Sequence, residues 1–371
     1  MATRTGMRTF ALVAALAVVV VGCWRQPQAT PTPTPTSQPV AASAAGPKRG
    51  ADAASGRCDR IALPSAPDNL AQVGDRVWIA SSADRSVQLA DLRSCRMVGR
   101  PIRLPKRARV SAPLPQSGWV WGPDRPGRLV ADERRLWVSG ELTLYRLDPA
   151  TRRIVRQITL YRLDRENATR RVPLDLSSVT LNQGTPWAAN LAEGETFIYK
   201  LASDTGRIQL KEPADSEIVG MTRGAGWVWA ISHDRGTLLR VDPRSGHFTR
   251  TRFSSEPHGV AFGAGYVWVA MYHQGTILRI DPATGRVVGA PIGVGFPPEP
   301  MAAAGGLLWA IPSTGGYMAD PRRHTVLKIA VSDGRILGSF RTEGRPHAVV
   351  AEPDGAWVAT SEPNELVWLR R

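Results

Sequence analysis

From about residue 56 to the C-terminus, the chain consists of short runs in which apolar and polar residues alternate. The runs that begin at Gly224 and Gly263 show the order most clearly: GAGWVWA or GAGYVWV is followed by TLLRVDP or TILRIDP and then by a Gly. Alternation of this kind predicts half-buried β-strands, and Asp-Pro and Gly predict tight turns between them. No segment with the period of a helix interrupts the runs. This part of the chain is therefore predicted to be all-β.

The same pattern recurs about every 40 residues, with insertions, and each copy carries one Trp at an equivalent place. These residues are Trp78, Trp137, Trp187, Trp229, Trp268, Trp309 and Trp357. A unit of this length with four short antiparallel strands is typical of a propeller blade. Because the Trp residues recur at one structural position, we expect them to pack between blades. The sequence predicts a seven-bladed β-propeller domain over residues 56–371.

The last repeat ends one strand short of a complete blade, because the chain stops shortly after Leu369. Residues 56–64 resemble the segment that forms the outermost strand of other repeats, with Gly56-Arg57 matching Gly285-Arg286. Pairing this N-terminal strand with the last blade would close the ring and remove its free edge. We therefore predict that residues 56–64 belong to the propeller and that only the residues before them form a tether.

The repeated pattern VWVA followed by I-x-R-I-D-P-x-T-G resembles that of the YVTN and YncE-like propellers, with a more distant similarity to the virginiamycin B lyase propellers. The resemblance covers about residues 56–371 and implies the fold. It leaves the activity open, because this group includes binding modules as well as a lyase, and a fold does not transfer a function.

The N-terminus has the layout of an export signal. Arg4 and Arg8 precede an uncharged apolar run from Phe10 to Val21, which is too short for an ordinary membrane-spanning helix. The residues Val20-Val21-Gly22-Cys23 resemble a bacterial lipobox, which implies a signal peptide over residues 1–22 and lipidation of Cys23. The alternative is an ordinary signal peptide with an incidental Cys. An extracytoplasmic protein anchored to the cell membrane is predicted.

Residues 23–55 contain Pro-Thr repeats followed by Ala, Ser and Gly, so they offer almost nothing apolar to bury. We expect a disordered tether between the lipidated Cys23 and the propeller. Beyond Cys23 the chain has two further cysteines, Cys58 and Cys95. In an exported protein this pair predicts a disulfide, and two free buried thiols are the alternative.

The chain is strongly basic, with a net charge of +15, but its Lys and Arg residues are mostly Arg. Such a bias in a chain rich in Ala, Gly and Pro reflects a GC-rich genome rather than selection for nucleic acid. No nucleic-acid partner is therefore predicted. An exported protein meets anionic lipids and wall polymers, so the expected partner besides the membrane is an anionic envelope polymer, a peptide or a protein. We expect a monomer.

Candidate site residues follow from the repeat, because the innermost strand of each blade should begin ten residues before its Trp. These positions are Asp68, Gly127, Ser177, Val219, His258, Glu299 and His347. Innermost strands begin at one end of the channel, so their first side chains should converge there. His258, Glu299 and His347 are the predicted catalytic residues, since imidazole and carboxylate groups move protons. With Glu256 they are also the predicted ligands of a divalent cation. The alternative is that these polar residues merely line a wet channel.

In the virginiamycin B lyase relatives a metal and a histidine acid/base act at this place, and Glu256-Pro257-His258 is similar to a Glu-x-His element there. Loops on the same face add candidate ligand-binding residues. They are Asp68, Arg107, Arg109, Trp119, Trp121, His233 and His273. Solvated loop histidine is the alternative interpretation of His233 and His273. Long loops on one face of a regular scaffold are where binding is usually found.

The sequence contains no phosphate-binding Gly loop, no G-x-S-x-G elbow, no H-E-x-x-H and no Cys cluster. A binding module that uses the loops at the channel mouth is therefore favoured over an enzyme. A metal-assisted lyase or hydrolase and a structural component of an envelope assembly are the alternatives. No cofactor is expected. A divalent cation is the one bound group that these residues could hold.

Overall fold

The computed structural model of the chain describes residues 58–105, 128–140, 142–163, 169, 171–191, 196–214, 216–313 and 321–371. All of these residues belong to one compact unit. The predicted signal peptide, the lipidated Cys23 and the tether lie outside the described residues. So do Arg107, Arg109, Trp119 and Trp121. Within the described ranges, no helix is long and apolar enough to cross a membrane.

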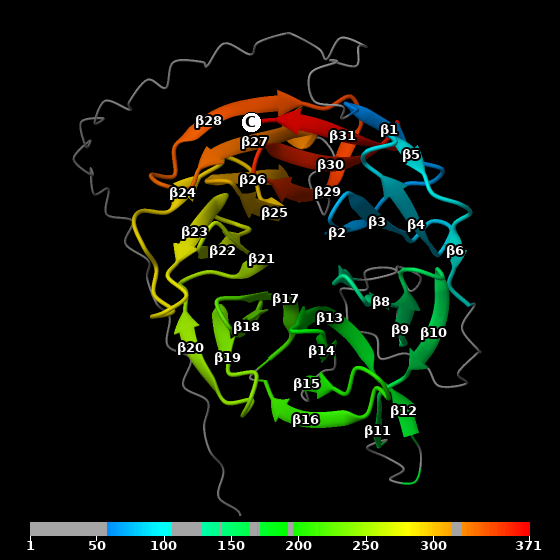
Figure 1. The fold of residues 1–371 in the computed structure, drawn as a ribbon. Coiled ribbons are helices and arrows are strands. Elements are labelled where there is room, and N and C mark those ends of the chain that lie inside the picture. The colour runs from blue at the N-terminus through cyan, green and yellow to red at the C-terminus, as the bar shows by residue number, and fades with distance from the viewer. Residues whose placement is uncertain are drawn as a thin grey trace, which may run out of the picture. The chain divides into compact units, whose positions relative to one another are not determined.

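Seven antiparallel sheets are arranged as blades in a ring, with one strand of each sheet nearest its centre (Figure 1). The innermost strands are β2 (Asn69–Val73), β7 (Leu129–Ala131), β13 (Asp175–Asn182), β17 (Ile218–Gly224), β21 (Pro257–Gly263), β25 (Pro298–Ala304) and β29 (Arg345–Glu352). The second strands are β3 (Arg76–Ser81), β8 (Leu136–Ser139), β14 (Thr185–Leu191), β18 (Trp227–Ser232), β22 (Tyr266–Met271), β26 (Leu307–Pro312) and β30 (Gly355–Ser361). This architecture confirms the predicted seven-bladed β-propeller.

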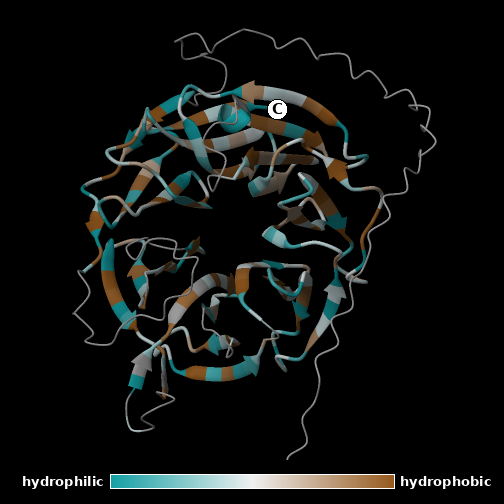
Figure 2. Ribbon diagram, turned by 180° about the vertical axis from the view of Figure 1, so that it is seen from behind, coloured by the Kyte–Doolittle hydropathy of each residue, from teal (hydrophilic) through white to brown (hydrophobic). Residues whose placement is uncertain are grey.

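The outer half of each blade is formed by a third and a fourth strand. The third strands are β4 (Ser86–Asp91), β9 (Leu144–Asp148), β15 (Phe197–Leu201), β19 (Thr237–Val241), β23 (Thr276–Ile280), β27 (Thr325–Ala330) and β31 (Glu365–Arg370). The outermost strands are β5 (Arg96–Met97), β10 (Arg153–Ile158), β16 (Ile208–Pro213), β20 (Phe248–Arg252), β24 (Ile292–Gly293), β28 (Ile336–Arg341) and β1 (Arg60–Ala62). In the outermost strand β16, hydrophobic and hydrophilic residues alternate from Ile208 to Lys211, and Figure 2 shows both kinds along the outer strands of the ring. The remaining elements are β6 (Ile102–Arg103), the ribbon of β11 (Tyr161–Leu163) and β12 (Arg171–Pro173), and the short 3-10 helix η1 (Pro321–His324).

The ring is closed by the N-terminal strand, as predicted. β1 pairs antiparallel with β31, with Arg60 opposite Val367 and Ile61 opposite Leu366, and the two strands lie side by side in Figure 1. The pairing is extended by a hydrogen bond of 2.9 Å from the Leu63 amide to the Asn364 carbonyl. The last blade therefore receives its fourth strand from the other end of the domain.

The seven repeated Trp residues are almost fully buried, between 0% and 2% exposed. Each lies in a cluster that it shares with the following blade: Trp268 of blade five, for example, packs with Leu308 and Ala310 of blade six. The backbones also approach closely, because a Cβ on Gly263 would lie 2.0 Å from the Ala303 oxygen. The Trp and Gly of the repeat thus build the contact between blades, which confirms the packing role predicted for the Trp residues.

The Asp-Pro-x-x-Gly segments form the predicted turns between third and fourth strands. In the turn at Asp281, its carboxylate accepts a hydrogen bond of 2.8 Å from the Ala283 amide, and its carbonyl accepts another from Gly285. Gly285 has a φ of +71°, a conformation that residues with a Cβ rarely adopt. The Asp and Gly of the motif are therefore explained by the local geometry of the turn.

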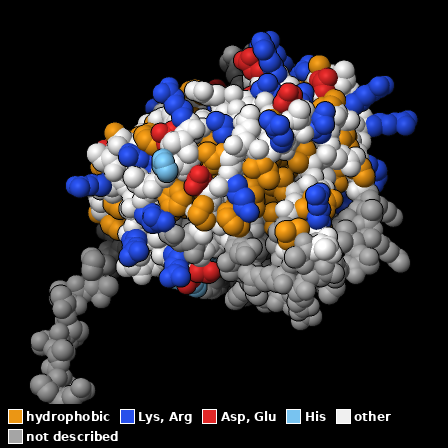
Figure 3. Space-filling view, turned by 90° about the horizontal axis from the view of Figure 1, so that it is seen from below, with side chains coloured by type: hydrophobic (Ala, Val, Ile, Leu, Met, Phe, Trp, Pro, Cys, Tyr) orange, Lys and Arg blue, Asp and Glu red, His pale blue; other side chains and the backbone are white. Residues whose placement is uncertain are grey.

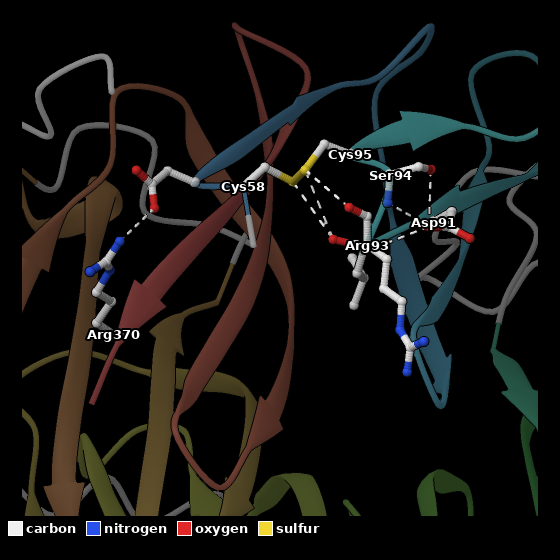
Figure 4. The surroundings of a disulfide bond; sticks show 8 residues. Cys58, Asp91, Arg93, Ser94, Cys95 and Arg370 are labelled. Atoms are coloured by element: carbon white, nitrogen blue, oxygen red, sulfur yellow. Dashed lines mark hydrogen bonds and ion pairs between the residues drawn. A yellow bond between two sulfur atoms is a disulfide. The ribbon is translucent and has the colours of Figure 1, made fainter. Parts of the chain in front are cut away.

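Cys58 and Cys95 form a disulfide, with their Cα atoms 5.7 Å apart (Figure 4). Cys58 precedes β1 of blade seven, and Cys95 lies in the turn before β5 of blade one. The bond therefore joins the first and last blades beside the closing strand. Next to it, Arg370 of β31 lies 3.4 Å from the Asp59 carboxylate.

Basic side chains serve as bridges between blades. Four Lys or Arg residues on third strands each donate a hydrogen bond to a carbonyl in the turn of the next blade: Arg146 to Ser203, Lys200 to Pro243, Arg240 to Ala283, and Arg279 to Ser332. Other Lys and Arg side chains are spread over the surface seen in Figure 3, with apolar side chains between them. Part of the positive charge of this chain therefore has a structural role.

Candidate functional site

Of the positions ten residues before each Trp, Gly127 lies outside the described residues, and the other six lie within two residues of the start of an innermost strand. In blades three to seven, the pairing of the first two strands shifts register at this position, which is occupied by Ser177, Val219, His258, Glu299 and His347. A β-bulge interrupts the pairing and re-aims a side chain. We call the end of the channel where the innermost strands begin the channel mouth.

The strongest concentration of titratable groups at the channel mouth lies between blades four and five. His233, in the loop from β18 to β19, places Nε2 3.3 Å from Oε2 of Glu256, which immediately precedes β21. His258, on β21, lies beside them, and potential ligand atoms of all three residues are within 4.8 Å of one another. We call His233, Glu256 and His258 the mouth cluster. Within the described residues, it is the one group of three His, Cys, Asp or Glu side chains close enough together to share a metal ion.

His258 is held by aromatic contacts within this cluster. Its ring stacks on Tyr272 at 4.3 Å between centroids and meets the His233 ring edge-on at 4.5 Å. Burial lowers the pKa of His258 to about 4, and the nearby His233 and His273 contribute to the lowering. The imidazole is therefore neutral at neutral pH, the form that coordinates a metal ion.

Further polar groups surround the mouth cluster. His273 lies 3.2 Å from the same Glu256 oxygen as His233, but its side chain is 62% exposed. Asp234 approaches His233 Nδ1 at 3.1 Å, which leaves Nε2 directed toward Glu256. Glu217, just before β17, has a raised pKa because it is partly buried and faces the charge of Asp234. Carboxylates thus surround the two imidazoles, and such groups orient metal ligands.

Glu299 is not part of the mouth cluster. It lies 4.0 Å from the guanidinium of Arg128, which follows the predicted position Gly127 in blade two. Arg128 also donates a hydrogen bond of 3.0 Å to the carbonyl of Val219 in blade four. Burial raises the pKa of Glu299, and Arg128 offsets part of that rise. Glu299 is therefore paired with a basic residue of blade two, which was not among the predicted site residues.

The other described candidates have local partners. His347 Nε2 lies 2.7 Å from the Ser361 hydroxyl at the end of β30. The Asp68 carboxylate accepts a hydrogen bond from the amide of Ser82. Neither residue belongs to the mouth cluster, so the predicted ligand set of Glu256, His258, Glu299 and His347 is not assembled as one group. The structure instead brings together Glu256, His258 and the loop residue His233.

The mouth cluster has the donor set of a cation site. Two imidazole nitrogens and one carboxylate oxygen suit Zn²⁺ and similar ions, and three protein ligands leave a coordination position for a further ligand. His258 is poorly suited to proton transfer, because a histidine with a pKa of about 4 is a weak base at neutral pH. The arrangement favours binding over acid/base chemistry by His258.

No family model matches this chain, and no curated protein is similar to it in sequence. Solved structures with the same fold include a chain of Kuenenia stuttgartiensis hydrazine synthase, with a TM-score of 0.63 and 14% identity over 88% of this chain and 99% of that one. A chain of the mitotic checkpoint complex has a TM-score of 0.62 and 12% identity, over 85% of this chain and 95% of that one. The Pan2 WD40 domain of Neurospora crassa has a TM-score of 0.58 and 10% identity, over 84% and 94%. At these identities the similarity establishes the propeller fold.

Proposed function

We propose that this chain is an extracytoplasmic, lipid-anchored binding protein that holds a divalent cation in the mouth cluster and captures its ligand there. The observation that carries the proposal is the closeness of the donor atoms of His233, Glu256 and His258, which lie within 4.8 Å of one another. They come from two separate segments, the β18–β19 loop and the start of β21. The fold thus brings together a donor set that the local sequence does not.

The environment of the cluster supports a resident cation. His258 is half-buried and neutral, so no proton has to be displaced from it at neutral pH. Glu256 supplies one negative charge and already lies within 3.3 Å of both His233 and His273. An ion bound here would keep a net positive charge and an open coordination position, and both favour an anionic or electron-rich ligand.

The N-terminal sequence supports the location. An apolar run that ends in a lipobox-like Cys23, followed by a Pro-Thr-rich stretch, is the layout of a tethered surface protein. The tether would let the channel mouth sample partners near the membrane. We propose an anionic envelope polymer, a peptide or a protein as the partner, and no nucleic acid.

A metal-assisted lyase or hydrolase is the second candidate. It is favoured by the Glu256-Pro257-His258 element, which resembles that of the virginiamycin B lyase propellers, and by an open position where a cation could activate water. The proteins of similar fold include a chain of an enzyme, hydrazine synthase, and one of an assembly, the mitotic checkpoint complex, so the fold does not choose between these roles. Loss of virginiamycin B on incubation with the Zn²⁺-loaded protein, followed by mass spectrometry, separates the enzyme from the binding protein. The binding protein leaves the compound intact.

Titration of the metal-free protein with Zn²⁺ by calorimetry tests the proposed function. We expect one tight site in the wild type and a loss of affinity of at least about tenfold in His233→Ala and in His258→Ala, since each removes one of three protein ligands. His247→Ala is the matched control, because His247 is exposed in the turn between β19 and β20 and should leave the affinity unchanged. Equal Zn²⁺ affinity in all four proteins would contradict the proposal.

A further inference from the structure

A second polar feature lies in the channel, formed by Arg128. The backbone of this residue is fixed to the neighbouring strand β8 at both ends: its amide donates to the Ser139 hydroxyl at 2.8 Å, and its carbonyl accepts from the Ser139 amide at 3.0 Å. From this support in blade two, the side chain reaches Val219 in blade four and Glu299 in blade six. The guanidinium group therefore lies across the channel rather than along its wall.

Within the part of the chain that the structure describes, the positive charge of Arg128 is incompletely neutralised. The distance of 4.0 Å to Glu299 is that of an ion pair without a hydrogen bond. Both described contacts of the guanidinium are made by Nη2, whereas a guanidinium has five N–H donors in a planar fork. The side chain as a whole is 35% exposed, so a ligand can reach part of it.

Arg128 belongs to the same mouth as the cation site. The Glu299 side chain packs over Gly259, where an added Cβ would lie 3.5 Å from its Cγ. Gly259 directly follows His258 in β21, so Glu299 links Arg128 to the strand that carries the mouth cluster. A ligand that enters the mouth can therefore meet both the mouth cluster and the guanidinium.

We propose that Arg128 binds a carboxylate group of the ligand that enters the channel mouth. This inference rests on the proposed function and names the chemical class of the ligand that is captured at the channel mouth. The planar fork of a guanidinium matches the two oxygens of a carboxylate. A singly charged group is favoured over a doubly charged phosphate, because Glu217, Glu256 and Glu299 already bring three acidic side chains to this region.

Glu299 has a defined part in this proposal. Its carboxyl group is the neighbour of Arg128 in the absence of ligand and competes with an incoming carboxylate for the guanidinium. The burial that raises the pKa of Glu299 weakens this competition. Removal of the charge in Glu299→Gln should therefore strengthen carboxylate binding rather than abolish it.

The test is acetate binding at neutral pH in chloride-free buffer, measured by NMR saturation transfer on the wild type and on Arg128→Met, Glu299→Gln and Arg156→Met. Each protein is measured both metal-free and loaded with Zn²⁺. We expect Arg128→Met to lower acetate affinity about tenfold in both forms and Glu299→Gln to raise it, as for a charge-assisted hydrogen-bonded pair. Arg156→Met, an exposed change on the outer strand β10, should behave as the wild type.

The two proposals fail in distinguishable ways. If Zn²⁺ does not bind to the mouth cluster but acetate binding still depends on Arg128, the cation site is wrong and the carboxylate site stands. If acetate binds equally to the wild type and to Arg128→Met, or does not bind to the wild type, the carboxylate site is wrong whatever the result with Zn²⁺. Should Arg128→Met fail to fold, an unchanged acetate affinity in Glu299→Gln overturns the inference.

Discussion

Lys200 of blade three donates a hydrogen bond of 2.8 Å from its Nζ to the carbonyl of Pro243 in blade four. Arg240 and Arg279 make the equivalent contact one and two blades further on. In the pattern I-x-R-I-D-P the basic residue therefore donates a hydrogen bond to the next blade. The Asp-Pro turn that follows it supplies the carbonyl that accepts a hydrogen bond from the basic residue of the preceding blade. This relationship explains why charge and turn residues recur together along the chain.

Loss of one such bridge should destabilise the ring. Arg279 donates to both Val331 and Ser332, so Arg279→Met leaves two carbonyls of blade six without this donor. We expect the free energy of unfolding to fall by about 1–3 kcal/mol, as for hydrogen bonds to charged groups. Urea denaturation measures it, with Arg286→Met as a control of the same chemistry in the exposed turn of the same blade. Equal stability of the two variants would refute the bridging role.

The disulfide should stabilise closure of the ring. Cys58 and Cys95 are 37 residues apart in sequence and join the first and last blades. Replacing both by Ala should lower the free energy of unfolding by about 2–4 kcal/mol. When the mature protein is denatured without reduction, a thiol-labelling reagent should react with neither Cys58 nor Cys95. A protein in which both thiols react and reduction leaves the melting temperature unchanged would rule out this role.

The closing strand predicts a difference between two truncations. Deletion of residues 24–54 should leave the melting temperature nearly unchanged, whereas deletion of residues 24–64 removes β1 and exposes the edge of β31. The longer deletion also removes Cys58. Differential scanning calorimetry compares the two proteins, and similar melting temperatures would show that β1 contributes little to closure.

Anchoring by Cys23 is tested in cells. If Val20–Cys23 is a lipobox, Cys23→Ser should leave the precursor unprocessed or release the protein into the medium, because the diacylglycerol acceptor is lost. Fractionation and mass spectrometry of the N-terminus distinguish these outcomes. A variant that remains acylated and membrane-bound like the wild type would disprove the assignment of Cys23.

His258 should make the protein sensitive to acid. Its pKa falls from 6.5 to about 4 in the folded protein, so its contribution to stability is complete above pH 6.5 and is lost as the pH falls toward about 4. In His258→Gln, the free energy of unfolding should therefore fall less over this interval than in the wild type. The raised pKa values of Glu217 and Glu299 act in the opposite direction in both proteins. Parallel pH profiles would show that His258 is not held neutral.

The fold could be predicted because the repeat encodes it several times. A Trp at one position, Gly at close approaches between blades and Asp-Pro turns recur at equivalent places in successive repeats, and a single sequence displays that recurrence. The closing strand could be predicted for the same reason, since residues 56–64 repeat the pattern of an outermost strand. The innermost strands begin 8 to 12 residues before their Trp, within two residues of the predicted offset of ten.

The side-chain partners at the mouth could not be predicted, because they depend on contacts between blades. His233 lies in a hairpin loop, where an exposed histidine has no periodic signal, and only the approach of Glu256 brings it into the cluster. Arg128 was missed because the position count fell on Gly127, whereas the side chain that enters the channel belongs to the next residue. The one signal available was a basic residue adjacent to the expected position.

The most direct test of the cation site is an anomalous difference map, recorded at the zinc edge, from crystals of the purified protein loaded with Zn²⁺. We expect a peak between His233, Glu256 and His258, with protein–metal distances of about 2.0–2.2 Å, and no such peak in crystals of His258→Ala. A map without a peak at the mouth cluster, or with the same peak in His258→Ala, would contradict the proposed cation site.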